Sequence, residues 1–84
     1  MSVFGVEQVL YDVSVKREVR ARFREDASAL LRAYPLTEEE SRLIASFEVG
    51  ELYRRGVSPL LTMGFWMTTA AERSMEAYLR NMRR

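Results

Sequence analysis

The sequence predicts an all-α fold, a small bundle of five or six short helices with a longer C-terminal amphipathic helix. Apolar residues recur three and four positions apart, while sustained two-residue alternation is almost absent. Residues that start or stop helices separate the apolar runs. The 84 residues are 48% apolar and 30% charged, enough for one small core. We therefore expect a single helical domain spanning residues 1–84.

The first two expected helices carry apolar residues on one side. A helix over about residues 3–13 has its apolar face at Val3, Val6, Val9, Leu10 and Val13. Ser14 is a suitable N-cap for a second helix, in which Val15, Val19 and Phe23 recur every four residues. The basic side chains of this second segment then face solvent.

Local start and stop signals place the middle helices. Asp26 is expected to cap a helix that Pro35 ends, with a buried face formed by Ala27, Leu30, Leu31 and Tyr34. Thr37 and Glu40 have the spacing of a capping box, so a further helix starts there.

Glycines punctuate the chain after the capping box. Gly50 is expected to end or bend the helix that starts at Thr37. A short helix over Leu52 and Tyr53 then stops at Gly56, a favourable residue just beyond a helix end.

The last helix is expected to begin at Ser58-Pro59 and to run to about Met82. Ser58 is a good N-cap, and proline is common at the first helical position. Gly64 or the Thr68-Thr69 pair could bend this helix.

The composition excludes several kinds of site. The chain has no cysteine and no histidine, which excludes disulfides, thiolate metal sites and histidine-assisted nucleophiles. We therefore expect no catalytic residue, no metal ligand and no cofactor in this chain. A formal net charge of +1 is too small to favour nucleic acid. The uncharged stretch over residues 56–71 would span only about 24 Å as a helix, so we expect a cytoplasmic protein without a membrane partner.

Two charged clusters have structural explanations. The acidic residues Glu38, Glu39 and Glu40 suit the positive end of a helix better than a metal site. The basic run from Lys16 to Arg24 suits the solvent side of an amphipathic helix. An RNA-binding patch is the alternative for the basic run, although it lacks interleaved stacking aromatics.

The last helix indicates a second chain. Its first half is apolar in every direction, which in a small domain favours burial against a partner. Its second half carries one stripe of adaptable methionines and aromatics. The expected partner interface consists of Leu60, Met63, Met67, Met75, Tyr78 and Met82.

The middle of the chain resembles a known family. The stretch from Phe23 to Thr37 reads FREDASALLRAYPLT. It has a Phe, an Asp three residues later, a helix rich in Ala and Leu, an aromatic residue, and Leu-Thr opening the next helix. Leu52-Tyr53 with Gly56 continues the similarity, which covers roughly residues 6 to 61. The pattern is similar to the small α-type subunit of protocatechuate 4,5-dioxygenase, the LigA-like extradiol ring-cleavage dioxygenase subunit family.

The resemblance implies a helical, non-catalytic accessory subunit. Such a subunit covers the active site of a larger β-type subunit, which binds Fe(II) and opens catechol-type rings with O2. The family's C-terminal part shapes the substrate pocket, but this chain departs from the family pattern after Leu61. Phe65 and Trp66 are expected by position to line the substrate.

A second hypothesis belongs to a different class. The chain could be a free-standing homodimeric helical interaction module without enzymatic activity. It would then self-associate through Met67, Met75, Tyr78 and Met82.

Overall fold

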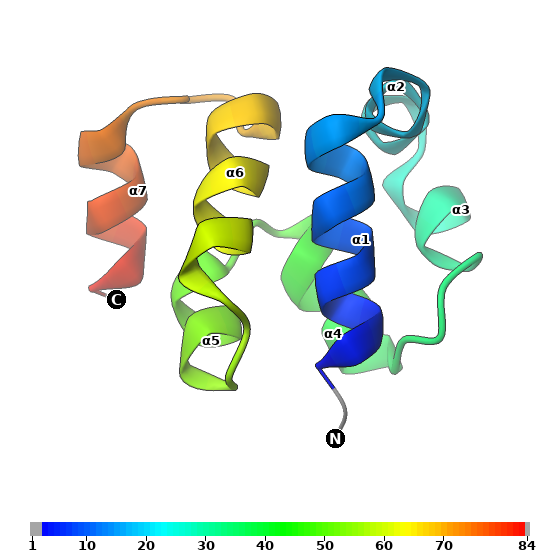
Figure 1. Ribbon diagram of the computed structural model, residues 1–84, viewed down its shortest axis with the longest axis horizontal. Helices are drawn as coiled ribbons and strands as arrows, with labels where there is room; N and C mark the ends of the chain where they lie inside the picture. The colour runs from blue at the N-terminus through cyan, green and yellow to red at the C-terminus, as the bar shows by residue number, and fades with distance from the viewer. Residues whose placement is uncertain (1–2, 84) are drawn as a thin grey trace.

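The computed structural model describes residues 3–83, and within that range all regular structure is helical. The all-α prediction is confirmed for this part of the chain (Figure 1). The helices in chain order are α1 (Phe4–Val15), α2 (Arg17–Glu25), α3 (Ala27–Leu31), α4 (Glu38–Ala45), α5 (Val49–Arg54), α6 (Pro59–Thr69) and α7 (Met75–Met82).

Helices α1 and α6 lie side by side at the centre of the molecule (Figure 1). They are the most extensively packed pair, although about fifty residues separate them in the sequence. The backbone N–H of Ser58 donates to a Glu7 carboxylate oxygen over 2.9 Å. Farther along the pair, a Cβ added to Gly64 would lie 3.4 Å from the Ser14 hydroxyl oxygen. The two helices therefore run parallel.

The other helices surround this pair. Helices α2 and α3 lie beyond α1, α7 lies on the far side of α6, and α4 and α5 lie behind in the view of Figure 1. Helix α7 packs mainly on α5. Burial of apolar side chains is the main driving force for this arrangement. The core consists of Val6, Val9, Leu10, Val13, Phe23, Leu30, Leu31, Leu43, Ile44, Val49, Leu52, Val57, Phe65, Trp66, Ala70, Ala77 and Tyr78.

Three predicted helix starts are confirmed. The Asp26 carboxylate accepts from the Ala29 N–H at the start of α3. The Thr37–Glu40 capping box is complete, with both reciprocal hydrogen bonds present. Ser58 caps α6, with Pro59 at the first helical position. These signals depend only on neighbouring residues, so the sequence alone identifies them.

The two glycines near α5 have different roles. Gly56 follows the end of α5 with φ of 103°, a backbone conformation that favours glycine, as predicted. Gly50 neither ends nor bends a helix, so that prediction is wrong: α4 ends at Ala45 and Gly50 lies inside α5. A Cβ at Gly50 would meet the Asn81 carbonyl oxygen at 2.7 Å. The glycine therefore permits close approach of α7.

The boundary between the first two helices differs from the prediction. Ser14 lies inside α1, where its hydroxyl donates to the Leu10 carbonyl oxygen over 2.6 Å. Lys16 instead is the N-cap residue of α2. Val15 therefore belongs to α1 and is exposed, whereas Phe23 in α2 is buried as expected. Helix α3 is also shorter than predicted, because it ends at Leu31 and leaves Tyr34 in the following turn.

The long C-terminal helix of the prediction is divided in two. Helix α6 ends at Thr69, and Ala70 is extended with ψ of 154°. Ser74 then caps α7 by accepting from the Ala77 N–H. The Thr68 hydroxyl bonds back to the Gly64 carbonyl oxygen at 2.7 Å, a contact that competes with regular helix structure. The break falls directly after the Thr68-Thr69 pair, one of the two positions at which the sequence predicts a bend.

Candidate functional site

An aromatic cluster joins α6 to three other parts of the chain. Phe47 stacks on Phe65 with ring centroids 4.7 Å apart. Phe23 meets both of these rings edge to face, at 5.9 and 5.6 Å. Trp66 contacts Phe47 at 6.3 Å and Tyr78 at 6.2 Å. Such pairs add stabilisation beyond burial alone, so the cluster fixes the position of Trp66.

Phe47 has a backbone conformation that is rare for an aromatic residue. Its φ of 55° is the only positive value at a non-glycine position among residues 3–83. The packing of its ring against Phe65 and Trp66 compensates for this strain. Sequence reasoning missed Phe47, because its position after α4 reads as a continuation of the helix and nothing local indicates a left-handed turn.

Trp66 forms one wall of a small groove. Its indole N–H donates to the Glu72 carbonyl oxygen over 2.9 Å, and only 8% of the residue is exposed. The groove has a volume of about 320 Å³, and its lining is mainly apolar. It is lined by Phe47, Trp66, Ala70, Ala71, Glu72, Ala77, Arg80 and Asn81. An aromatic edge beside small alanines suits a flat apolar group.

The other predicted substrate-lining residue lies deeper. Phe65 has no exposed surface and packs within the aromatic cluster against Phe23 and Phe47. Tyr78, predicted at a partner interface, is 3% exposed, and its hydroxyl lies 2.9 Å from that of Thr62. Their roles toward a substrate or a partner stay predictions. In this structure both side chains are covered by the chain's own residues.

The remaining predicted interface residues reach the surface from two helices. Leu60 is 80% exposed, and Met67 is 37% exposed, both on α6. Met75, on α7, is 44% exposed. Met63 and Met82 are partly buried against the core. Because the chain breaks between α6 and α7, these residues do not form the single stripe that a continuous helix would give.

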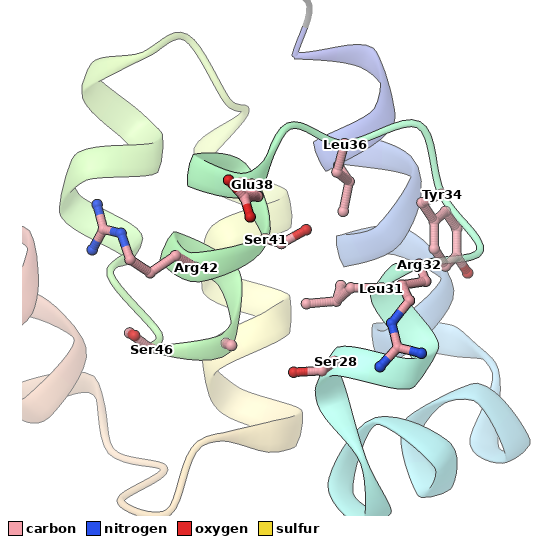
Figure 2. A pocket seen from close by; sticks show the side chains of 10 residues that line it. Ser28, Leu31, Arg32, Tyr34, Leu36, Glu38, Ser41, Arg42 and Ser46 are labelled. Atoms are coloured by element: carbon pink, nitrogen blue, oxygen red, sulfur yellow. The ribbon is translucent and has the colours of Figure 1, made fainter.

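A second, larger groove lies between α3 and α4. Its volume is about 720 Å³. Figure 2 shows that Ser41 and Leu36 point into it, whereas Arg42 points away. Arg42 instead pairs with Glu48 at 3.3 Å. The lining residues are Ser28, Leu31, Arg32, Tyr34, Leu36, Glu38, Ser41, Arg42, Ala45 and Ser46. This mixture of hydroxyls, apolar groups and arginines suits polar ligands more than the aromatic groove does.

A polar contact inside the fold perturbs two titrating groups beside the larger groove. The Tyr34 hydroxyl donates to the Asp12 carboxylate over 2.8 Å. Burial tends to raise the pKa of Asp12, but hydrogen bonds from Tyr34, Lys16 and Gln8 outweigh it and lower the pKa. Burial, followed by the Asp12 contact, raises the pKa of Tyr34 to about 12. The pair joins α1 to the turn after α3.

Most of the ion pairs lie around α4 and α5. Arg55 contacts Glu39 at 2.7 Å and Glu51 at 2.9 Å. The hydrogen bond to Arg55 lowers the pKa of both carboxyls. Within residues 3–83, no group of three or more acidic side chains is placed to hold a metal ion. None of the described helices is both long enough and apolar enough to cross a lipid bilayer.

Known proteins provide a family assignment. The sequence model described as "Aromatic-ring-opening dioxygenase LigAB, LigA subunit" matches residues 6–83. The match includes α6 and α7, so the predicted departure from the family pattern after Leu61 is wrong: the similarity continues to residue 83. Neither curated proteins nor solved structures gave a match. Because the family model covers most of the chain, this protein belongs to the LigA subunit family of aromatic-ring-opening dioxygenases.

Proposed function

We propose that the chain is a non-catalytic accessory subunit of an Fe(II)-dependent extradiol ring-cleaving dioxygenase. The family match over residues 6–83 is the observation that carries this proposal. The partner is a larger catalytic subunit of the β type, and the chain covers its active site. A cover of this kind excludes water and holds the aromatic substrate in place.

The donor groups of this chain agree with iron held by the partner. Histidine is absent from the sequence, and the described acidic side chains do not converge on one point. The chain's residues therefore do not fit an Fe(II) site, for which two histidines and a carboxylate are typical ligands. The contribution of this chain is the shape and polarity of its surface.

Trp66 supports a direct contact with the substrate. Of the two predicted substrate-lining residues, only Trp66 reaches a groove, whereas Phe65 supports it from below through Phe47. Trp66 could thus supply an apolar aromatic wall, held by its hydrogen bond to Glu72. Phe65 would act as a positioning residue for this wall.

The function is tested by purifying the tagged chain from its native cells. We expect a larger, iron-containing protein to co-purify in equal amount and to open catechol-type rings. Removing the small chain should lower kcat/KM by about tenfold or more, since positioning and water exclusion are lost, while the iron content stays unchanged. An equally active partner without this chain would contradict the accessory role.

The Trp66 assignment has its own test. Trp66→Phe keeps an aromatic ring but removes the indole N–H that bonds to Glu72. We expect a higher KM with an unchanged iron content. Leu79→Ala, which truncates an exposed residue on α7, is the matched control. An unchanged KM in the Trp66 variant would remove this residue from the substrate site and leave the subunit role intact.

A further inference from the structure

The outward sides of α1 and α6 form an apolar surface, called here the α1–α6 face. On α1, Phe4 is 77% exposed, Tyr11 52% and Val15 54%. On α6, Leu60 is 80% exposed and Met67 37%. Exposed apolar side chains that adjoin on two neighbouring helices form a contiguous patch of the kind that often marks an interaction site.

Helix geometry places these residues on one continuous surface. Phe4 and Tyr11 are seven positions apart, as are Leu60 and Met67, so each pair lies along one side of its helix. Glu7 borders a shallow hollow with Phe4 and Tyr11. Its carboxylate accepts from the Ser58 N–H at the start of α6. Leu60 follows two residues later, so the exposed side chains of both helices meet at this contact.

The α1–α6 face lacks exposed charge. Helix α6 has no charged residue, and α1 has only Glu7 and Asp12. Glu7 is engaged by the Ser58 N–H, and Asp12 is buried with Tyr34. The adjoining helix α2, by contrast, carries four arginines in nine residues. Depletion of charge is the compositional mark of an interface core.

The size of the face matches the apolar core of an interface. Taking about 150–250 Å² for a large side chain, the five residues expose on the order of 500 Å² of apolar surface. A standard interface buries about 800 Å² per partner, of which somewhat over half is apolar. Permanent complexes bury more than about 1,000 Å² per subunit, whether the partner is a second copy or a different chain. The family assignment, rather than the area, favours a different chain as the partner, because the matching family is the LigA subunit of a LigAB dioxygenase.

We propose that the α1–α6 face is the surface by which this chain docks on the catalytic dioxygenase subunit. The inference rests on the proposed function, because it takes that subunit as the occupant. Leu60 and Tyr11 are the anchors, since they are large, apolar and central to the face. Trp66 lies on an adjacent side of α6, toward Phe47 and Tyr78, so a catalytic subunit docked on the α1–α6 face would extend around α6 to bring its substrate to the Trp66 groove.

The experiment measures binding of variants to the iron-containing subunit purified with the wild-type chain. Tyr11→Glu with Leu60→Glu places two carboxylates in the face at exposed positions, so the fold should persist. We expect Kd to rise about 100-fold or more, because the charges lose water on docking. The matched control is Tyr53→Glu, at a residue that is 48% exposed on α5, away from the face. Circular dichroism and the thermal midpoint verify folding of each variant.

Each outcome decides the inference. A folded double variant that binds like the wild type, or a Tyr53 variant that weakens binding equally, overturns the α1–α6 face but leaves the proposed function standing. If the wild-type chain recovers no ring-opening subunit, both proposals fail. A wild-type dimer that the double variant dissociates, with no effect on binding to the catalytic subunit, assigns the face to a second copy and overturns the heteromeric docking. A single Leu60→Arg substitution repeats the test with the opposite charge.

Discussion

The two sides of α6 are similarly apolar in sequence, yet only one is covered. On the inner side, Phe65 and Trp66 are buried by Phe47 and Tyr78, which come from other parts of the chain. On the outer side, Leu60 and Met67 remain in contact with solvent. The sequence pattern indicates that α6 needs burial all round. The structure shows that the chain itself covers only the inner side, and the outer side is the part that the docking proposal assigns to the catalytic subunit.

The largest expected effect comes from truncating the inner side. Phe65→Ala removes a fully buried ring of the aromatic cluster and leaves a cavity, at a cost of about 3–5 kcal/mol in the free energy of unfolding. Urea denaturation measures this loss. Leu60→Ala, on the outer side of the same helix, should change stability by less than about 0.5 kcal/mol. Equal losses in the two variants would remove the distinction between the sides.

A smaller effect is expected where α7 closes over the inner side. Gly50→Ala places a methyl group 2.7 Å from the Asn81 carbonyl oxygen, so α7 must shift. We expect a loss of about 1–3 kcal/mol by overpacking, together with faster proteolysis between residues 70 and 74. Gly64→Ala is the control, because the nearest atom to the added methyl group would be the Ser14 hydroxyl oxygen, at 3.4 Å. A Gly50 variant as stable as the wild type would contradict the close packing of α7 on α5.

The stability contributed by the hydrogen bond between Tyr34 and Asp12 on α1 should depend on pH. Asp12→Asn weakens the bonds from Tyr34 and Lys16, at a cost of about 1–2 kcal/mol at pH 7. Because the pKa of Asp12 is lower in the folded state than its ordinary 3.8, its stabilisation is present above that value and is lost as the pH falls further. The wild type should therefore lose stability below about pH 4 more steeply than the variant. Parallel acid-denaturation profiles would reject this role of Asp12.

The raised pKa of Tyr34 predicts a loss of stability at alkaline pH. Its pKa is raised from 10 to about 12, so its contribution is complete below pH 10 and is lost as the pH rises through 12. Tyr34→Phe should remove this alkaline loss. Subtracting the ultraviolet titration of the Tyr34→Phe variant from that of the wild type should show one phenol ionising near pH 12. A midpoint near pH 10 would contradict the raised pKa of Tyr34.

The smallest effect is expected at the charged edge formed by α4 and α5. Glu39→Gln weakens the contact with Arg55, but Glu51 remains to hold that side chain. Exposed ion pairs of this kind contribute little and are screened by salt. We expect a change close to the error of a thermal melt, which 0.5 M salt abolishes. A loss that persists at high salt would give this edge a structural importance comparable to the inner side.

Local signals predicted much of the fold, and long-range contacts explain what they missed. The caps at Asp26, Thr37 and Ser58 depend on neighbouring residues, so they were identified correctly. The role of Gly50 depends on Asn81, thirty-one residues away, and no local pattern reports that approach. The break after Thr69 likewise brings α7 back along α6, where Tyr78 meets Thr62.

The candidate site was predictable only in part. The methionines and aromatics of α6 predict a partner or substrate contact on this helix, but their pattern could not show which side the chain itself would cover. The sequence placed Val15 on the apolar side of the second helix, whereas the structure places it in α1, where it and Tyr11 are exposed. Phe47 was missed because its left-handed backbone is stabilised by rings from distant segments.

The bond between Glu7 and Ser58 also has a consequence for the order of folding. The two residues are 51 positions apart, so α1 meets its principal neighbour only after four intervening helices have been synthesised. Closing so long a loop carries an entropic cost that local helix formation does not. The α1 half of the α1–α6 face is therefore synthesised before α2 to α5, and the α6 half after them. A catalytic subunit that requires both halves would select finished molecules over incomplete ones, so assembly itself would act as quality control.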